Sequence, residues 1–133
     1  MATAVKYDYG LGRRKSATAR ARLVKGKGVI TINDKPAEQY LNGNKSLLAE
    51  VTDPLAIAGK QKDFDVSVKV SGGGISGQVD AIKVAIAKAI TVGAPDLRPT
   101  LKKAELLRRD PREKERKKYG LRSARKREQY SKR

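Results

Sequence analysis

The sequence predicts an α+β fold in which a mainly antiparallel four-stranded sheet is covered by helices. Two patterns of apolar residues predict this fold. Residues 17–24 and 64–70 alternate apolar and polar side chains, as half-buried strands do. Residues 79–90 instead place apolar side chains at helical spacing, which forms a wide stripe suited to covering a sheet. The residues of this stripe are Val79, Ile82, Ala85, Ile86, Ala89 and Ile90.

Three strands are expected in the first third of the chain, joined as an antiparallel meander. The first covers residues 5–14, where β-branched and aromatic residues accompany a turn loosened by Gly10-Leu11-Gly12. The second covers residues 17–24 and turns Arg20 and Arg22 to the face opposite its alanines. The third covers residues 29–32, after the glycine-rich turn at 26–28.

Two short helices are expected before the fourth strand. Asp34 as a cap and Pro36 in the first turn predict a helix that runs to about Leu41. Asp53-Pro54 predicts the start of a second helix, which stops at Gly59.

Two further helices are expected after the glycine run at 72–77. Ser76 can cap the first, and Asp80 in its first turn would complement the helix dipole. Gly93 and Pro95 end this helix. Asp96 is expected to cap a last helix with one apolar face. The residues of that face are Leu97, Leu101 and Ala104.

The charge of the chain indicates a polyanionic partner. The 133 residues include 31 Lys and Arg against 14 Asp and Glu, a formal net charge of +17. Residues 111–133 hold 11 of the basic residues and have few apolar side chains, so burial cannot offset the entropy of ordering them. We therefore expect a globular domain over residues 1–110 and an extended basic tail over residues 111–133. Nucleic acid is the first candidate partner.

The composition argues against several classes of function. The chain has no cysteine, which removes disulfides, thiolate metal sites and thiol nucleophiles, and no histidine, the commonest general base. Its first residues lack the apolar core of a signal peptide, and no uncharged apolar run is long enough to span a membrane. We expect an intracellular, non-enzymatic protein with no cofactor, no metal and no membrane association.

The glycine run permits three interpretations. Gly72, Gly74 and Gly77 match a dinucleotide-binding pattern, but no second parallel strand is expected after the helix. Gln78 also stands where a phosphate-binding loop needs lysine. Both observations disfavour a nucleotide cofactor. A flexible turn remains, as does a close approach of an RNA backbone to the helix N-terminus, where N–H groups favour phosphate.

A cluster of cations surrounds the turn between the first two strands. Arg13-Arg14-Lys15 alone is compatible with an ordinary solvated loop. Arg20 and Arg22 share a strand face, however, so the charges form a patch, which favours contact with RNA or DNA. Lys83 lies at the edge of the apolar stripe, where its stem packs and its head reaches outward, whereas Lys88 is expected only to be solvated.

Two tyrosines interrupt the basic tail. Tyr119 and Tyr130 are each suited to stacking on a base or ribose, and packing against a partner without base recognition is equally compatible. A targeting signal is a further alternative, while interleaved glutamates argue against a membrane-surface segment. Several arginines can bridge phosphate oxygens through two N–H groups. These are Arg122, Arg125, Arg127 and Arg133.

Five motifs occur in order from about Tyr7 to the last residue. They are Gly10-Leu11-Gly12-Arg13-Arg14-Lys15-Ser16 with Ala19-Arg20, Gly72-Gly73-Gly74-Ile75-Ser76-Gly77-Gln78 with Ala81-Ile82-Lys83, Arg109-Asp110-Pro111-Arg112, Glu115-Arg116-Lys117-Lys118-Tyr119-Gly120-Leu121-Arg122, and Gln129-Tyr130-Ser131-Lys132-Arg133. Together they resemble the bacterial small-subunit ribosomal protein S-nine family. The resemblance is specific because several long motifs are in register.

The resemblance implies both a fold and a place of action. The fold is a two-layer α/β sandwich with a left-handed βαβ crossover, an exception to the right-handed rule. The function is that of a structural constituent of the small-subunit head, which binds the 3′ domain of the rRNA and supports translation in the cytoplasm. Neighbouring head proteins are the other expected partners, and no homo-oligomer is expected.

The resemblance also implies a role for the tail. The tail threads through rRNA to the peptidyl (P) site, where Lys132 and above all Arg133 contact the anticodon stem-loop of the bound tRNA. This chain has Arg127-Glu128 where many relatives have Ala-Pro, which leaves the local path of the tail open.

The clusters and the resemblance together give a set of expected contacts, with a general nucleic-acid-binding protein or RNA chaperone as the alternative function. The residues expected to contact rRNA are Arg13, Arg14, Lys15, Arg20, Arg22, Gly73, Gly74, Ser76, Gln78, Lys83, Arg109, Arg112, Arg116, Lys117, Lys118, Tyr119, Arg122, Arg125, Lys126 and Arg127. Those expected to contact tRNA are Tyr130, Ser131, Lys132 and Arg133.

Overall fold

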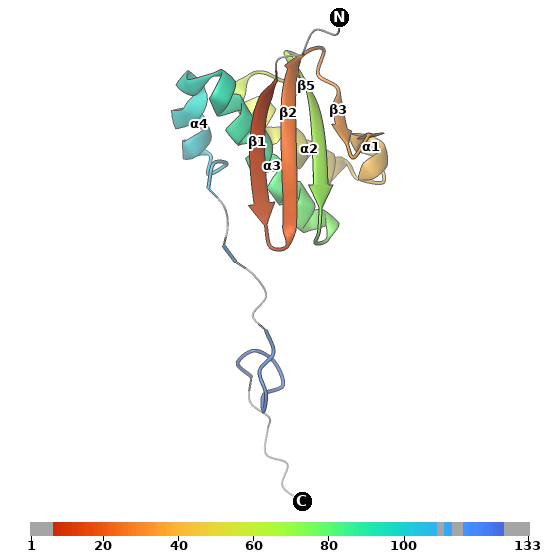
Figure 1. The fold of residues 1–133 in the computed structure, drawn as a ribbon, viewed down its shortest axis with the longest axis vertical. Helices are drawn as coiled ribbons and strands as arrows, with labels where there is room; N and C mark the ends of the chain where they lie inside the picture. Colours follow the sequence, from red (N-terminus) through yellow and green to blue (C-terminus); the bar gives the residue numbers. More distant parts are fainter. Residues whose placement is uncertain (1–6, 109–110, 113–115, 127–133) are drawn as a thin grey trace, which may run out of the picture.

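The computed structural model describes residues 7–108, 111–112 and 116–126, and it shows a sheet with helices behind it (Figure 1). The α+β prediction is confirmed. The sheet has five strands rather than the expected four, because residues 35–36 form a short additional strand. The strands are β1 (Asp8–Arg14), β2 (Ala17–Lys25), β3 (Ile30–Ile32), β4 (Lys35–Pro36) and β5 (Phe64–Ser71).

The strand order is β1-β2-β5-β3-β4, so the predicted meander of the first three strands is wrong. β1 and β2 do form an antiparallel hairpin. β5 then pairs antiparallel with β2 and separates it from β3. The eight residues of β5 provide a long ladder and bury Val66, Val68 and Val70, whereas β3 offers only three residues. The longer strand therefore takes the central place.

β3 and β5 are parallel, and two helices connect them. These are α1 (Ala37–Tyr40) and α2 (Lys45–Ala58). Parallel neighbours require such a crossover, so the βαβ connection implied by the resemblance is present, while its left-handed sense stays a prediction. The predicted cap of α1 is wrong, since Asp34 precedes β4 and α1 begins only at Ala37 without a side-chain cap.

The second crossover helix starts earlier than predicted. Asn44, and not Asp53, caps α2, because its side chain accepts hydrogen bonds from the N–H groups of Ser46 at 3.1 Å and Leu47 at 3.3 Å. Pro54 lies inside the helix, where burial with Val51 and Leu55 offsets its missing N–H. Gly59 ends the helix in a left-handed conformation, as expected.

The predicted apolar stripe belongs to α3 (Ile75–Gly93), which packs against β1, β2 and α2. The predicted cap is wrong, since Gly74 occupies the cap position, no side chain caps the helix, and Ser76 lies inside it. Asp80 is beyond the first turn and pairs with Arg14 instead. The helix ends at Gly93, as the sequence predicts.

The glycines of β1 lie under α3 and not in a turn. Gly10 and Gly12 are buried within the strand, where a Cβ on Gly12 would collide with the carbonyl oxygen of Ala81 and lie 2.6 Å from the backbone nitrogen of Ala85. A Cβ on Gly10 would meet Ala85 and Ala89 in the same way. The helix therefore approaches the strand backbone directly, which only glycine permits.

The last helical segment begins with a 3-10 turn, η1 (Pro95–Leu97), followed by α4 (Arg98–Lys103). Asp96 lies within η1, and no side chain caps either element, so the predicted cap is wrong. Leu101 is buried, as its place on the apolar face predicts.

The core between sheet and helices is aliphatic, because the chain has no Trp and only one Phe. Its residues come from β2, β3, β5, α1, α2, α3 and α4, and within the described ranges no polar or charged residue is buried. Within the described ranges all buried residues precede Arg108, and the division into a globular domain and a basic tail stays a prediction. The boundary between residues 110 and 111 stays a prediction.

A single carboxylate organises the loop between β2 and β3. Asp65 Oδ1 accepts hydrogen bonds from the N–H groups of Lys27 at 2.9 Å, Gly28 at 3.1 Å and Val29 at 3.0 Å. The bonds from Val29 and Lys27 are the main cause that lowers the pKa of Asp65 below its ordinary value of 3.8.

We expect Asp65→Ala to lower the melting temperature at neutral pH. Because the folded pKa is depressed, this stabilisation is present above the ordinary value of 3.8 and disappears as the pH falls through the folded value. The difference between wild type and variant should therefore shrink at acid pH. Thermal unfolding followed by circular dichroism measures it, with Asp53→Ala on the exposed side of α2 as the control. A difference that is constant with pH would contradict this expectation.

Candidate nucleic-acid interface

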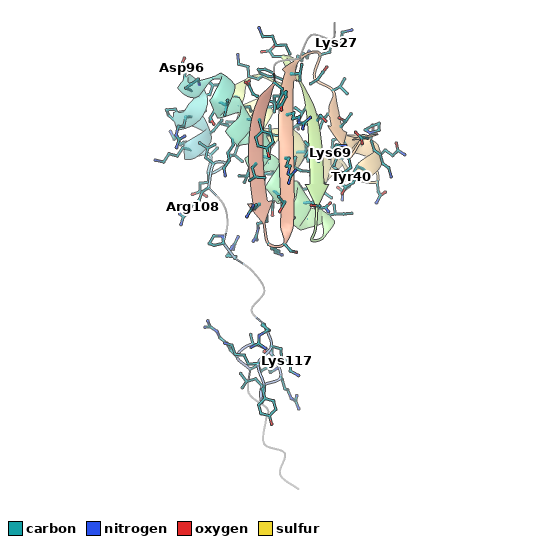
Figure 2. All side chains as sticks on the ribbon, viewed as in Figure 1. Lys27, Tyr40, Lys69, Asp96, Arg108 and Lys117 are labelled. Atoms are coloured by element: carbon teal, nitrogen blue, oxygen red, sulfur yellow. The ribbon has the colours of Figure 1, made fainter. Side chains whose placement is uncertain are left out.

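The face of the sheet opposite the helices carries four exposed cations. Arg13 lies on β1, Arg20 and Arg22 on β2, and Lys69 on β5, and Lys69 is labelled on this face in Figure 2. We call these residues the sheet-face patch. The alternation of β2 requires this arrangement, because its alanines face the core. The prediction that Arg20 and Arg22 share one face is confirmed.

The charges of the sheet-face patch are only partly compensated. Lys69 Nζ donates a hydrogen bond to Asp34 Oδ2 at 2.6 Å. Among the described residues, no carboxylate forms a salt bridge with Arg20 or Arg22. Arg20 and Lys69 are also direct cross-strand neighbours, and like charges in such positions destabilise a sheet. A polyanion bound to this face would remove that repulsion.

The glycine run lies beside the turn between β1 and β2. Gly72 has φ 79°, and a Cβ there would collide with the carbonyl oxygen of Ser16, so this position requires glycine. A Cβ on Gly77 would lie 3.6 Å from the carbonyl oxygen of Arg14. The first turn of α3 and the basic turn that holds Lys15 are therefore adjacent, with Gly73, Gly74 and Ser76 exposed beside them.

This arrangement bears on the three interpretations of the glycine run. In the described part of the chain no strand follows α3, so the βαβ unit of a dinucleotide site is absent there. The glycine run forms the turn between β5 and α3, as the interpretation of a flexible turn requires. The approach of an RNA backbone to this end of the sheet stays a prediction, supported by the cations that surround the turn.

Gln78 has an internal role. Its Nε2 donates to the carbonyl oxygen of Gly72 at 3.1 Å, and its Oε1 accepts from the hydroxyl of Tyr40 at 2.6 Å. These bonds tie the glycine turn to α1. The residue thus positions the turn, while the predicted contact of Gln78 with rRNA stays untested.

Arg14 faces the protein. Its side chain is only 12% exposed, its Nε lies 3.5 Å from Asp80 Oδ2, and its Nη1 donates to the carbonyl oxygen of Arg112. Arg14 therefore fixes the root of the tail against β1 and α3. Its predicted rRNA contact remains a prediction beside this structural role.

A basic pocket surrounds this anchor. Its volume is about 220 Å³, and it includes the partly buried Lys83, as expected for a lysine at the edge of the stripe. The pocket brings cations of β1, α3 and the tail together. It is lined by Arg13, Arg14, Asp80, Lys83, Val84, Glu105, Leu106, Arg108 and Arg112.

A larger pocket of about 810 Å³ lies between α4 and the root of the tail. Its cations Arg98, Lys102 and Arg108 are not among the contacts predicted from the sequence. The four-residue spacing of Arg98 and Lys102, which places them on one side of a helix, was the available signal. The remaining lining residues are Glu105, Leu107, Pro111 and Arg112.

The described part of the tail is exposed and turned. Arg122 N donates to the carbonyl oxygen of Lys126 at 2.8 Å, and Lys126 N donates to Ser123 Oγ at 3.2 Å. Residues 122–126 are therefore looped rather than fully extended. Tyr119 is fully exposed, which agrees with either predicted role of its ring. The other predicted contacts described here are exposed too: Arg116, Lys117, Lys118 and Arg125.

Several predicted contacts lie outside the described residues. They are Arg109, Arg127, Tyr130, Ser131, Lys132 and Arg133.

Two further observations concern the described ranges only. No group of carboxylates there is placed to hold a metal ion. No helix in that part of the chain has the length and apolar character needed to cross a membrane.

The fold and these surfaces define a class: a basic α+β protein whose cations gather on the open face of a sheet and at one end of it. The chain belongs to the family described as ribosomal protein S9/S16, whose model matches residues 12–133. The resemblance found in the motifs is thereby confirmed.

Relatives match along almost the whole chain. The chain is 54% identical over 125 residues to small ribosomal subunit protein uS9 of Synechococcus sp. (strain JA-2-3B'a(2-13)), an alignment that covers 94% of this chain and 92% of that protein. It is 53% identical over 128 residues to small ribosomal subunit protein uS9 of Solidesulfovibrio magneticus, with 96% and 98% covered.

Proposed function

We propose that this chain is a structural constituent of the small ribosomal subunit that binds rRNA of the 3′ domain in the subunit head and supports translation. The family match over residues 12–133 carries this proposal, together with relatives that are named as small-subunit proteins over nearly their full length. The role is non-enzymatic and cytoplasmic. Neighbouring proteins of the subunit head are further partners, and the chain acts as a single copy.

The cations divide this work between the body and the tail. The sheet-face patch and the turn that holds Lys15 present positive charge on the body, where rRNA phosphates bind. From Arg112 onward the tail neutralises further phosphates along its path. Its last two residues, Lys132 and Arg133, contact the anticodon stem-loop of P-site tRNA, an assignment that rests on the resemblance.

Co-sedimentation and competition test this function. The tagged protein should sediment with the small subunit, and the purified protein should bind head rRNA more tightly than unrelated RNA at physiological salt. Equal affinity for any duplex would instead support the alternative, a general nucleic-acid-binding protein or RNA chaperone, because phosphate contacts alone carry no sequence information.

We expect deletion of Lys132 and Arg133 to leave assembly into the subunit intact and to weaken retention of P-site tRNA by about tenfold or more, because charge-assisted hydrogen bonds each contribute roughly 1.5–3 kcal/mol. Filter binding of tRNA to subunits reconstituted with each variant measures the loss. Arg133→Lys keeps the charge and is the control. Failure of the shortened protein to assemble would show that the tip has a different role.

A further inference from the structure

We propose that Tyr9 is a nucleobase-stacking site on the open face of the sheet, where it receives a base from a single-stranded segment of RNA held by Arg20 and Arg22. This inference rests on the proposed binding of rRNA and specifies how one surface of the body takes part. Neither the basic residues nor the motifs of the sequence pointed to this tyrosine.

The first observation is the exposure of two aromatic rings on this face. Tyr9, the second residue of β1, is 43% exposed, although the same strand buries Gly10 and Gly12 on its other side. Tyr7, two residues earlier, is 47% exposed. Together with the half-buried Leu11, these side chains form an apolar row that begins just before β1 and continues along it at the two-residue spacing of one strand face.

The second observation is the register of this row against the arginines. Tyr9 is the direct cross-strand partner of Arg22, and Leu11 is the direct partner of Arg20. The guanidinium carbon of Arg22 lies 5.0 Å from the centroid of the Tyr7 ring, which is a cation–π distance. The arginine is thereby held beside Tyr9. An aromatic ring with two flanking guanidinium groups provides both a stacking surface and phosphate donors.

The distribution of charge confines the RNA to one half of the sheet. The carboxylate of Asp34 accepts a hydrogen bond from Lys69 and offsets its charge on the β5 side. Asp65 also lies on β5, opposite Val24. The positive half of the face is therefore the part over β1 and β2, which is where the aromatic row lies.

The chemistry of the face indicates an unpaired RNA segment. Sequence-specific recognition of RNA uses splayed bases that stack on aromatic or guanidinium planes, whereas bases within a duplex are not accessible to a ring. The face also carries the small polar side chains of Thr18, Ser67 and Ser71 and, at its end, the half-buried Val24 opposite Asp65. The apolar part of the face is thus a narrow row of rings flanked by cations and small polar side chains, which suits stacked bases beside phosphates.

The experiment uses the full chain and a transcript of the 3′ domain of small-subunit rRNA. Tyr9→Leu removes the ring, keeps apolar bulk, and should weaken binding by about tenfold or more, because the base loses the aromatic surface on which it stacks. Tyr9→Phe keeps the ring and should bind like the wild type. Ile57→Ala removes another exposed apolar side chain, on α2, and is the matched control. Circular dichroism of each variant verifies the fold.

Photo-crosslinking gives an independent readout. Ultraviolet irradiation of the wild-type complex should attach a nucleotide to the peptide that contains Tyr9, and mass spectrometry locates it.

Two results together would overturn the stacking site and leave rRNA binding standing. These are an unchanged affinity of Tyr9→Leu for the transcript and a reduced affinity of the double variant Arg20→Glu, Arg22→Glu. A wild-type protein that fails to bind the transcript would overturn the proposed function itself. Crosslinking of Tyr9 to another protein in the assembled subunit would also overturn the stacking site.

Discussion

Gly12→Ala is expected to lower the free energy of unfolding by about 3 kcal/mol or more, the upper part of the range for overpacked cores. The added Cβ would collide with the carbonyl oxygen of Ala81 and lie 2.6 Å from the backbone nitrogen of Ala85. Both obstacles are backbone atoms of α3, which cannot move aside as a flexible side chain does. The helix must therefore separate from β1, and the core contacts along both elements weaken. Urea denaturation measures the loss.

A matched glycine separates this effect from the loss of glycine as such. Gly74→Ala introduces the same methyl group where no atom lies within 4 Å, and its φ of −93° is suitable for alanine. We expect it to leave the stability nearly unchanged. A Cβ on Gly10 would collide with the backbone of Ala85 and Ala89 in the same way. A variant that carries both Gly10→Ala and Gly12→Ala should therefore not fold at all. Wild-type stability of Gly12→Ala would show that α3 does not contact β1 through its backbone.

Neutralising the cations of residues 116–126 is expected to cause the largest loss of rRNA affinity. Replacing six cations with glutamine would remove up to about six phosphate contacts, and the slope of log affinity against log salt would become less negative by about four to five units. The six are Arg116, Lys117, Lys118, Arg122, Arg125 and Lys126. Affinity for the transcript of the 3′ domain, measured at several salt concentrations, gives the slope.

The control for this variant keeps the charge and changes the side chains. Exchanging Lys for Arg and Arg for Lys at the same six positions should preserve the slope, because counterion release depends on charge. An unchanged slope in the glutamine variant would mean that this segment does not contact phosphate. The fold is expected to survive, since residues 116–126 contribute no buried residue to the core.

The strong periodic segments were predictable from the sequence because their patterns coincide with burial. In β5 the alternation of apolar and polar residues matches the alternation of buried and exposed positions. In α3 the apolar stripe is the side that packs against the sheet. The neighbours of β5 were not predictable. Antiparallel pairing of β2 with β3 across a short turn is local and plausible, and only the competition for the central position in the sheet excludes it.

The ends of the helices were predicted less well, for a local reason. Asp34, Asp53, Ser76 and Asp96 all have cap chemistry, yet the structure uses none of them as a helix cap. A cap contributes only about 1 kcal/mol, so the burial of an apolar face decides where a helix begins. Burial is the reason that α2 continues through Pro54, while Asn44 supplies the cap at its start.

In the candidate interface, too, some features follow from a local sequence pattern and others do not. Arg20 and Arg22 were predictable because a strand alternates, and their shared face follows directly. Arg14 belongs to the same basic motif, but its contacts with Asp80 and Arg112 join residues far apart in the chain. No local pattern distinguishes an arginine that anchors the tail from one that is exposed.

By itself, the sequence determined the aliphatic core, the basic charge and the family. These properties depend on composition and on motifs that are contiguous in the chain. Only the tertiary structure decided that β5 lies between β2 and β3, that Gly10 and Gly12 are contact points for α3, and that Tyr9 lies beside Arg22. The physical reason is that these relations are set by packing between segments distant in sequence, where backbone approach and cross-strand register are chosen by the core as a whole.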